Sequence, residues 1–165
     1  GATNVLRSGN KFAAILTLLG DAAKGYVAVM LAKYFAPQFS FGEPVIAAVA
    51  LAALLGHMLP VFHAFKGGKG VATAIGILFA VETGLAVGVL IIWLLVLYFS
   101  RMSSLASICG AVVATLLGAN YFGFGWMTLS LLIMSLLIIY RHRENISKLM
   151  RGEESRFGST KRDKL

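Results

Sequence analysis

The sequence predicts an all-α integral membrane protein, a polytopic helix bundle, and two observations carry that prediction. First, 58% of the 165 residues are hydrophobic and only 13% are charged, whereas soluble domains are about 45–50% apolar and about 25% charged. Second, the apolar residues gather in runs that are longer than barrel strands and show no period-two alternation. A soluble core of this size could not hide so much apolar surface, so we expect a bilayer around it.

The apolar runs divide residues 1–165, read as one transmembrane domain, into about six membrane segments. In chain order these are 12–35, 45–65, 71–81, 84–99, 105–119 and 126–140. The first two are long enough to cross a hydrocarbon core of about 30 Å unaided. At about 1.5 Å per residue the run 71–81 is too short, which predicts a half-helix packed among its neighbours. The last two are somewhat short, which predicts tilt or extension into the interface.

The basic residues predict the orientation of these segments. If the segments cross alternately, all 15 Lys and Arg residues except Lys24 and Lys33, which lie inside the first segment, fall on one side. The positive-inside tendency makes that side cytoplasmic and places both ends of the chain there. The basic tail 141–165 is then a solvated cytoplasmic end that also attracts anionic lipid. We therefore expect membrane lipids, and no nucleic acid, as partners of this positive charge.

A few polar residues lie inside the apolar segments, where they are costly. Asp21 and Lys24 share a helix face, and they are either an ion pair that fixes helix packing or a wall of a polar site. His57, three residues before the helix-breaking Pro60, is either a hydrogen-bonded packing residue or part of the same site. The three histidines have no ligand-like spacing with carboxylates or with Cys109, so we expect no metal site.

The stretch AFKGGKGVATA, residues 64–74, predicts an anion-binding turn. Its glycines allow successive N–H groups to converge on an anion, and a helix starting at about Val71 adds free amides and the positive end of its dipole. The stretch is no nucleotide P-loop, because Gly70 stands where Ser or Thr would follow the GK pair. The alternative is a flexible basic turn that obeys the positive-inside bias. The turn residues are Lys66, Gly67, Gly68, Lys69 and Gly70.

Two more polar clusters fall on the same predicted membrane side. In YRHRENISK, a continuing helix would place His142 and Asn145 on one face, as donors beside a titratable imidazole. In SSLAS, Ser104 and Ser107 share a face at the start of a segment, although serines there can also act only as helix caps. With Asn4, these clusters and the glycine turn gather at one face of the membrane, which predicts a single site.

Four stretches, GATNVLR, GHMLPVFHAFKGGKGVATA, SSLASI and YRHRENI, resemble the signature segments of the bacterial acyl-phosphate:glycerol-3-phosphate acyltransferase family, known as PlsY. The resemblance implies a seven-helix enzyme of the inner membrane with its site on the cytoplasmic side. It also implies transfer of a fatty acyl group from acyl phosphate to the sn-1 hydroxyl of glycerol 3-phosphate, giving lysophosphatidic acid and phosphate, without acyl-CoA or any cofactor. Functional coupling to the enzyme that makes acyl phosphate would follow.

The six segments would be the second to seventh helices of that fold. A further helix and a serine- and glycine-rich stretch precede GATN in the family and are not in this sequence. The resemblance thus implies an N-terminally truncated chain, with part of the phosphate site upstream of Gly1.

The resemblance also assigns roles. The glycine amides would hold phosphate with Lys69 as a point charge and Arg7 as a forked donor. Asn4, Ser107 and Asn145 would orient the attacking hydroxyl or steady the oxyanion. His142 would handle the proton, with a substrate phosphate oxygen as the rival base. The residues expected to act in catalysis are Lys69, Ser107, His142 and Asn145. Those expected to bind substrate or phosphate are Thr3, Asn4, Arg7, His57, Lys66, Gly67, Gly68, Lys69, Gly70 and Ser104.

A different class of protein remains as the alternative function. A small membrane transporter or channel for an anionic solute is suggested by Asp21 and Lys24 within a span and by the half-helix. A transporter predicts polar residues distributed through the membrane depth, whereas here they gather at one face. That distribution favours an interfacial enzyme whose acyl chain lies in a groove between helices.

Overall fold

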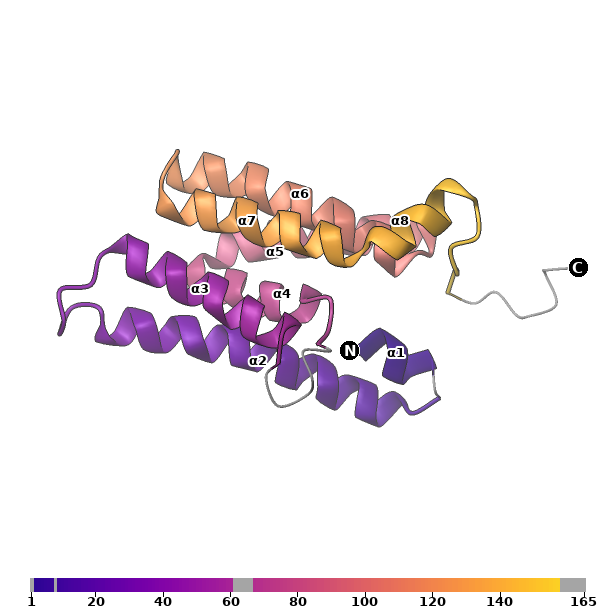
Figure 1. Cartoon of the computed structure of the whole chain (residues 1–165), viewed down its shortest axis with the longest axis horizontal. Helices are drawn as coiled ribbons and strands as arrows, with labels where there is room; N and C mark the ends of the chain where they lie inside the picture. The colour runs from indigo at the N-terminus through magenta and orange to yellow at the C-terminus, as the bar shows by residue number, and fades with distance from the viewer. Residues whose placement is uncertain (1, 8, 61–66, 158–165) are drawn as a thin grey trace, which may run out of the picture.

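The computed structural model describes residues 2–7, 9–60 and 67–157, and these residues form eight helices (Figure 1). The helices are α1 (Ala2–Arg7), α2 (Lys11–Phe35), α3 (Glu43–Met58), α4 (Val71–Val81), α5 (Thr83–Ser100), α6 (Ser103–Phe122), α7 (Trp126–Arg141) and α8 (Arg143–Met150). By length and composition α2, α5 and α6 can each cross a membrane, and α3, α4 and α7 are shorter apolar helices. The predicted fold class, an all-α polytopic bundle, is confirmed.

Helix α3 ends before the second predicted segment does, and residues 61–65 of that segment lie outside the described part of the structure. The segment was expected to run to Phe65, but α3 ends at Met58, and Leu59 has left the helical region at φ −126° and ψ 58°. The cause is Pro60, which lacks an N–H group and disfavours the helical conformation of the residue before it. By contrast α4 has the predicted bounds, and α6 extends beyond the predicted 105–119, as the interfacial extension of a short segment requires.

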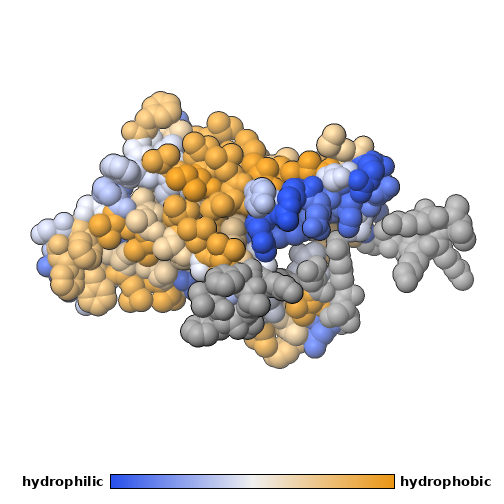
Figure 2. All heavy atoms as spheres, in the orientation of Figure 1, coloured by the Kyte–Doolittle hydropathy of each residue, from blue (hydrophilic) through white to orange (hydrophobic). Residues whose placement is uncertain are grey.

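The bundle has a polar end and an opposite end made of short connections. Helices α1 and α8 lie at one end, and the α2–α3 and α6–α7 connections lie at the other (Figure 1). Hydrophilic side chains cover α8 at the first end, whereas hydrophobic side chains cover the middle of the face shown in Figure 2. The six apolar helices α2 to α7 therefore run back and forth between the two ends, as a multi-pass membrane protein does.

Close backbone contact between α2 and α4 sets the position of the site. A Cβ atom added to Gly25 would lie 2.5 Å from the carbonyl oxygen of Thr73, and one added to Gly76 would overlap the carbonyl of Ala22. Small residues let two membrane helices approach until their backbones touch. This contact fixes the start of α4 against the middle of α2.

Two charged side chains form hydrogen bonds to helix ends at the opposite end of the bundle. The Lys33 ammonium donates to the carbonyl oxygens of Ala80 at 3.0 Å and Val81 at 3.3 Å, so it caps the C-terminus of the short α4. Glu43 Oε1 accepts a hydrogen bond of 2.7 Å from the backbone N–H of Met127 in the first turn of α7. A carboxylate at a helix N-terminus is stabilising, and here it also joins α3 to α7.

Candidate active site

The glycine turn, residues 67–70, lies against the last turn of α3 and leads directly into α4. A Cβ atom on Gly67 would overlap the carbonyl oxygen of His57, and one on Gly68 would overlap the imidazole ring. Gly70 has φ 85°, in the left-handed region that favours glycine. The first N–H groups of α4 have no acceptor within the helix. The turn therefore leads into the N–H groups that begin α4 and into the positive end of its dipole, at the polar end of the bundle.

A chain of hydrogen bonds joins the turn to the starts of α6 and α8. The Lys69 ammonium donates to Asn145 Oδ1, and Asn145 Nδ2 donates to Glu154 Oε1 at 2.8 Å. The same carboxylate oxygen accepts from Ser104 Oγ at 2.7 Å. Glu154 is buried although it follows α8 in a polar stretch. Because the Nδ2 group of Asn145 donates to Glu154, the Oδ1 atom of the same amide faces Lys69. This hydrogen bond fixes the position of the Lys69 ammonium.

His142 lies just past the end of α7 and is buried beside this network. Its Nδ1 atom is 2.8 Å from the carbonyl oxygen of Ile138. A carbonyl can only accept, so Nδ1 carries the proton and Nε2 of the neutral ring is the acceptor. Burial lowers the pKa of His142, the positive charge of Lys69 lowers it further, and the Ile138 hydrogen bond and Glu154 oppose them. The ring is thus a neutral base at pH 7.

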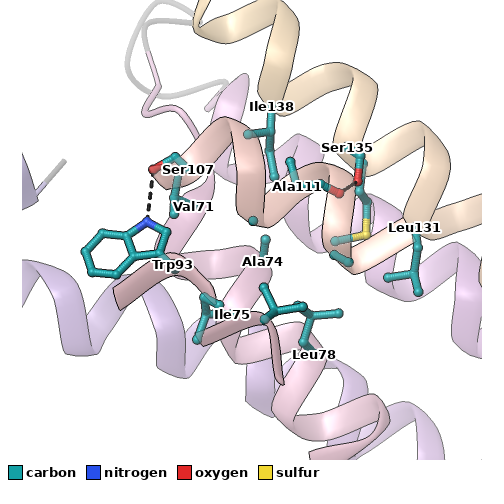
Figure 3. Close-up of a pocket in the computed structure, with 14 residues that line it drawn as sticks. Val71, Ala74, Ile75, Leu78, Trp93, Ser107, Ala111, Leu131, Ser135 and Ile138 are labelled. Atoms are coloured by element: carbon teal, nitrogen blue, oxygen red, sulfur yellow. Dashed lines mark hydrogen bonds between the residues drawn. The ribbon is translucent and has the colours of Figure 1, made fainter. Parts of the chain in front are cut away.

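The hydroxyl of Ser107, which follows Ser104 by one turn of α6, is held in a fixed orientation. Ser107 Oγ donates to the carbonyl oxygen of Ser103 at 2.8 Å and accepts from Trp93 Nε1 at 3.2 Å (Figure 3). The hydroxyl has one proton, and that proton is engaged. Ser107 can therefore accept one more hydrogen bond, but it can donate to an oxyanion only by leaving Ser103.

Arg141 and His57 hold the glycine turn from two sides. Arg141 Nη2 donates to the carbonyl oxygen of Gly67 at 2.6 Å. His57 lies between Gly68 and the ion pair of Asp21 and Lys24. The turn is therefore fixed by side chains from α3 and α7, which favours a prearranged geometry over a flexible basic loop.

An apolar cavity opens next to this polar cluster, between α4, α5, α6 and α7 (Figure 3). Its volume of only about 30 Å³ makes it a narrow slit. Val71, the first residue of α4 after the glycine turn, and Ser107 both line it. Its other lining residues are mainly apolar, and they include Ala74, Leu78, Trp93, Ala111, Leu131 and Ile138. The slit and the glycine turn therefore adjoin.

The structure brings most of the predicted site residues together. Lys69, Asn145 and Ser104 belong to one hydrogen-bonded chain, and His142 is buried beside it. Thr3 is half-buried on α1. Three predicted residues cannot be placed, because Lys66 and the side chains of Asn4 and Arg7 lie outside the described part of the structure. Among the described residues, no group of three or more His, Cys, Asp or Glu side chains could hold a metal ion.

Sequence reasoning missed three side chains that shape the site. Glu154 lies in the basic tail, where a glutamate is expected in water, and its burial is a property of the tertiary fold. Trp93 is one of many large apolar residues on α5, and no spacing signals its hydrogen bond to Ser107. Arg141 was read as part of the basic end of the last span. The sequence signal was its position next to His142 and four residues before Asn145.

The sequence of this chain is similar to those of known proteins. The sequence model of the family described as Glycerol-3-phosphate acyltransferase matches residues 1–152. A protein of that name from Paraburkholderia phymatum is 52% identical over 98% of this chain and 77% of its own length. Another from Ralstonia pickettii is 54% identical over 98% of this chain and 78% of its own length.

Two solved structures share the fold. Both are crystal structures of PlsY (YgiH), an integral membrane glycerol 3-phosphate acyltransferase, one in a glycerol 3-phosphate form and one in a lysophosphatidic acid form. They superpose on 96% of this chain with 40% identity and TM-scores of 0.89 and 0.88, and this chain covers 78% and 79% of theirs. The chain belongs to the glycerol-3-phosphate acyltransferase family.

Proposed function

We propose that this chain transfers a fatty acyl group from acyl phosphate to the sn-1 hydroxyl of glycerol 3-phosphate, giving lysophosphatidic acid and inorganic phosphate. Membership of the family makes glycerol 3-phosphate the acceptor. One observation supports acyl phosphate as the donor: the glycine turn, with Lys69, meets an apolar slit at Val71 and Ser107. A molecule with a phosphate head and an apolar tail fits a cationic seat that adjoins an apolar slit.

The phosphate groups are held at the polar end of the bundle. The glycine amides of the turn and the N–H groups of the first turn of α4 supply hydrogen bonds to phosphate oxygens, and the Lys69 ammonium supplies a full charge. The acyl chain enters the slit, where Ala74 and Ala111 leave space between the helices. The acyl carbonyl then lies close to Ser107, between the phosphate-binding glycine turn and the apolar slit.

The reaction is acyl transfer with phosphate as the leaving group. The sn-1 hydroxyl oxygen attacks the acyl carbonyl carbon, the bond between that carbon and the phosphate oxygen breaks, and phosphate departs with the electron pair. His142 takes the hydroxyl proton on Nε2, because Nδ1 already carries a proton and burial keeps the ring neutral. Asn145 and Glu154 hold Lys69 in place for the charge that develops.

The site is assigned to the cytoplasmic side of a bacterial inner membrane. Arg7 is in α1, and Arg143 and Lys148 are in α8, so basic residues gather at the end of the bundle that carries these two helices (Figure 1). The positive-inside tendency places such an end in the cytoplasm. A water-soluble acceptor and a lipid donor meet there at the membrane surface. Supply of acyl phosphate by the enzyme that makes it would occur on the same side.

The test is an assay of the full-length protein in liposomes with palmitoyl phosphate and glycerol 3-phosphate. Lys69→Ala removes the cation and is expected to lower kcat/KM about 100-fold, the usual effect of losing one group that stabilises developing charge. The matched control is Lys148→Ala, which removes an exposed lysine of α8 and is expected to leave kcat/KM unchanged. Turnover with acyl-CoA alone, or phosphate release that does not depend on Lys69, would contradict the proposal.

A further inference from the structure

A cluster of three ionisable side chains lies inside the membrane segments, next to Gly68 of the glycine turn. Lys24 Nζ on α2 is 2.7 Å from Asp21 Oδ1 and 2.5 Å from Nδ1 of His57, in the last turn of α3. His57 Nδ1 is 3.4 Å from the same carboxylate oxygen. Ionisable groups within membrane helices are costly, and those that occur usually serve a site. The cluster adjoins the site through Gly68.

The contacts of Lys24 determine which nitrogen of His57 carries the proton. An ammonium group has only donors, so the nitrogen that it approaches at 2.5 Å must be an acceptor. The alternative, a proton on Nδ1 directed at Asp21, would need a hydrogen bond of 3.4 Å, longer than ordinary N–H···O bonds of about 2.7–3.2 Å. Asp21 instead neutralises and orients Lys24. His57 is therefore a neutral ring with its proton on Nε2.

That proton faces the glycine turn. A Cβ atom added to Gly68 would overlap Nε2 of His57, so the ring edge lies directly against the backbone of this residue. Within the part of the chain that the structure describes, no residue accepts a hydrogen bond from Nε2. The ring thus holds a directed donor beside the amides and the Lys69 charge that form the proposed phosphate seat.

We propose that His57 donates its Nε2–H to a phosphate oxygen bound at the glycine turn, and that Lys24 and Asp21 are positioning residues that keep His57 in this tautomer. The proposal rests on the proposed function, because it takes the turn to be a phosphate seat. It adds a neutral donor to the seat without adding charge. It also gives Asp21 and Lys24 a role beyond helix packing. The phosphate belongs either to glycerol 3-phosphate or to acyl phosphate, which share this chemistry.

Two variants of His57 distinguish the loss of the Nε2–H donor from the loss of the imidazole ring. Glutamine places its amide near the position of Nε2, whereas the shorter asparagine amide lies near Nδ1. His57→Asn is expected to raise the KM of one phosphate substrate about tenfold or more, as the loss of one hydrogen bond to a charged group does. His57→Gln is expected to restore most of the lost affinity. Measuring KM for glycerol 3-phosphate and for palmitoyl phosphate separately identifies which phosphate is bound.

The positioning role of Lys24 has its own variant and control. Lys24→Met is expected to raise the same KM as His57→Asn, with a smaller effect on kcat. Lys11→Met removes a lysine at the start of the same helix, away from the cluster, and is expected to change neither constant. A purely structural role for Lys24 would lower the yield of folded enzyme without selecting one substrate.

Nitrogen-15 NMR of the wild-type protein in nanodiscs tests the tautomer without any variant. The His57 spectrum is expected to show protonated Nε2 and unprotonated Nδ1, and the Nε2–H signal is expected to shift when glycerol 3-phosphate or a non-reactive acyl phosphonate is added. A proton on Nδ1, no shift with either ligand, or equal KM effects of asparagine and glutamine would overturn the inference. Absence of acyl transfer by the wild-type protein would instead contradict the proposed function.

Discussion

Replacement of Glu154 tests the hydrogen-bonded chain that holds Lys69. Both of its hydrogen bonds, from Ser104 and from Asn145, end on the same carboxylate oxygen, Oε1. Glu154→Gln keeps an acceptor oxygen at that position and removes the charge. Glu154→Ala removes the acceptor from two donors, the buried hydroxyl of Ser104 and the half-buried amide of Asn145. The two variants therefore separate the charge of Glu154 from its capacity to accept.

The expected magnitudes follow from these two bonds. A hydrogen bond to a charged group contributes about 1.5–3 kcal/mol and a neutral one about 0.5–1.5 kcal/mol, so each of the two bonds loses about 1 kcal/mol. Glu154→Gln is therefore expected to lower the free energy of unfolding by about 2 kcal/mol. A buried donor without a partner costs about 1–3 kcal/mol, so Glu154→Ala is expected to cost about 2–6 kcal/mol. Freed from the carboxylate, Asn145 no longer fixes Lys69, so kcat/KM falls together with stability in the alanine variant.

The assay combines unfolding in detergent with acyl transfer in liposomes. Glu153→Gln is the matched control, because its exposed pair with Arg151 contributes at most about 1 kcal/mol. The expected order of stability is wild type and Glu153→Gln, then Glu154→Gln, then Glu154→Ala. An alanine variant as stable as the wild type, or a glutamine variant as damaged as the alanine variant, would refute the reasoning.

Three further predictions concern the turn, the base and the slit. Gly68→Ala forces a methyl group against His57 and is expected to abolish turnover in the liposome assay, whereas Gly20→Ala, with open space around it, is expected to be neutral. Because burial lowers the pKa of His142 below its usual value of about 6.5, kcat should fall only as pH drops below about 6.5; an acid limb above pH 7 would contradict this. Ala111→Leu narrows the slit and should raise the KM of palmitoyl phosphate but not of glycerol 3-phosphate.

The sequence was sufficient to predict the helices wherever hydropathy and backbone chemistry agree. The bounds of α4 were predicted because an apolar run ends at Gly70 on one side and at Glu82 on the other. The end of α3 was misplaced because hydropathy continues to Phe65, whereas the missing N–H group of Pro60 stops the helix. Local chemistry was the better guide there, since a helix needs its hydrogen bonds as well as an apolar environment.

The site was predictable only in part. Lys69 and Asn145 were both expected at the polar end of the bundle, and the structure joins them by a hydrogen bond. The burial of Glu154 could not be expected, because it results from the way the chain after α8 turns back: the N–H of Phe157 donates to the carbonyl oxygen of Arg101 at 2.8 Å. Such long-range contacts leave no period or spacing in the sequence.

The central claim is that phosphate is held at the glycine turn while the acyl chain enters the slit beside it. The most direct measurement is a structure of the full-length protein with a non-reactive acyl phosphonate bound. The account predicts the phosphonate within hydrogen-bonding distance of the Gly68 amide and Lys69, with the tail between α4 and α6 beside Ala111. A phosphonate bound away from the turn, or a tail lying in another groove, would contradict it.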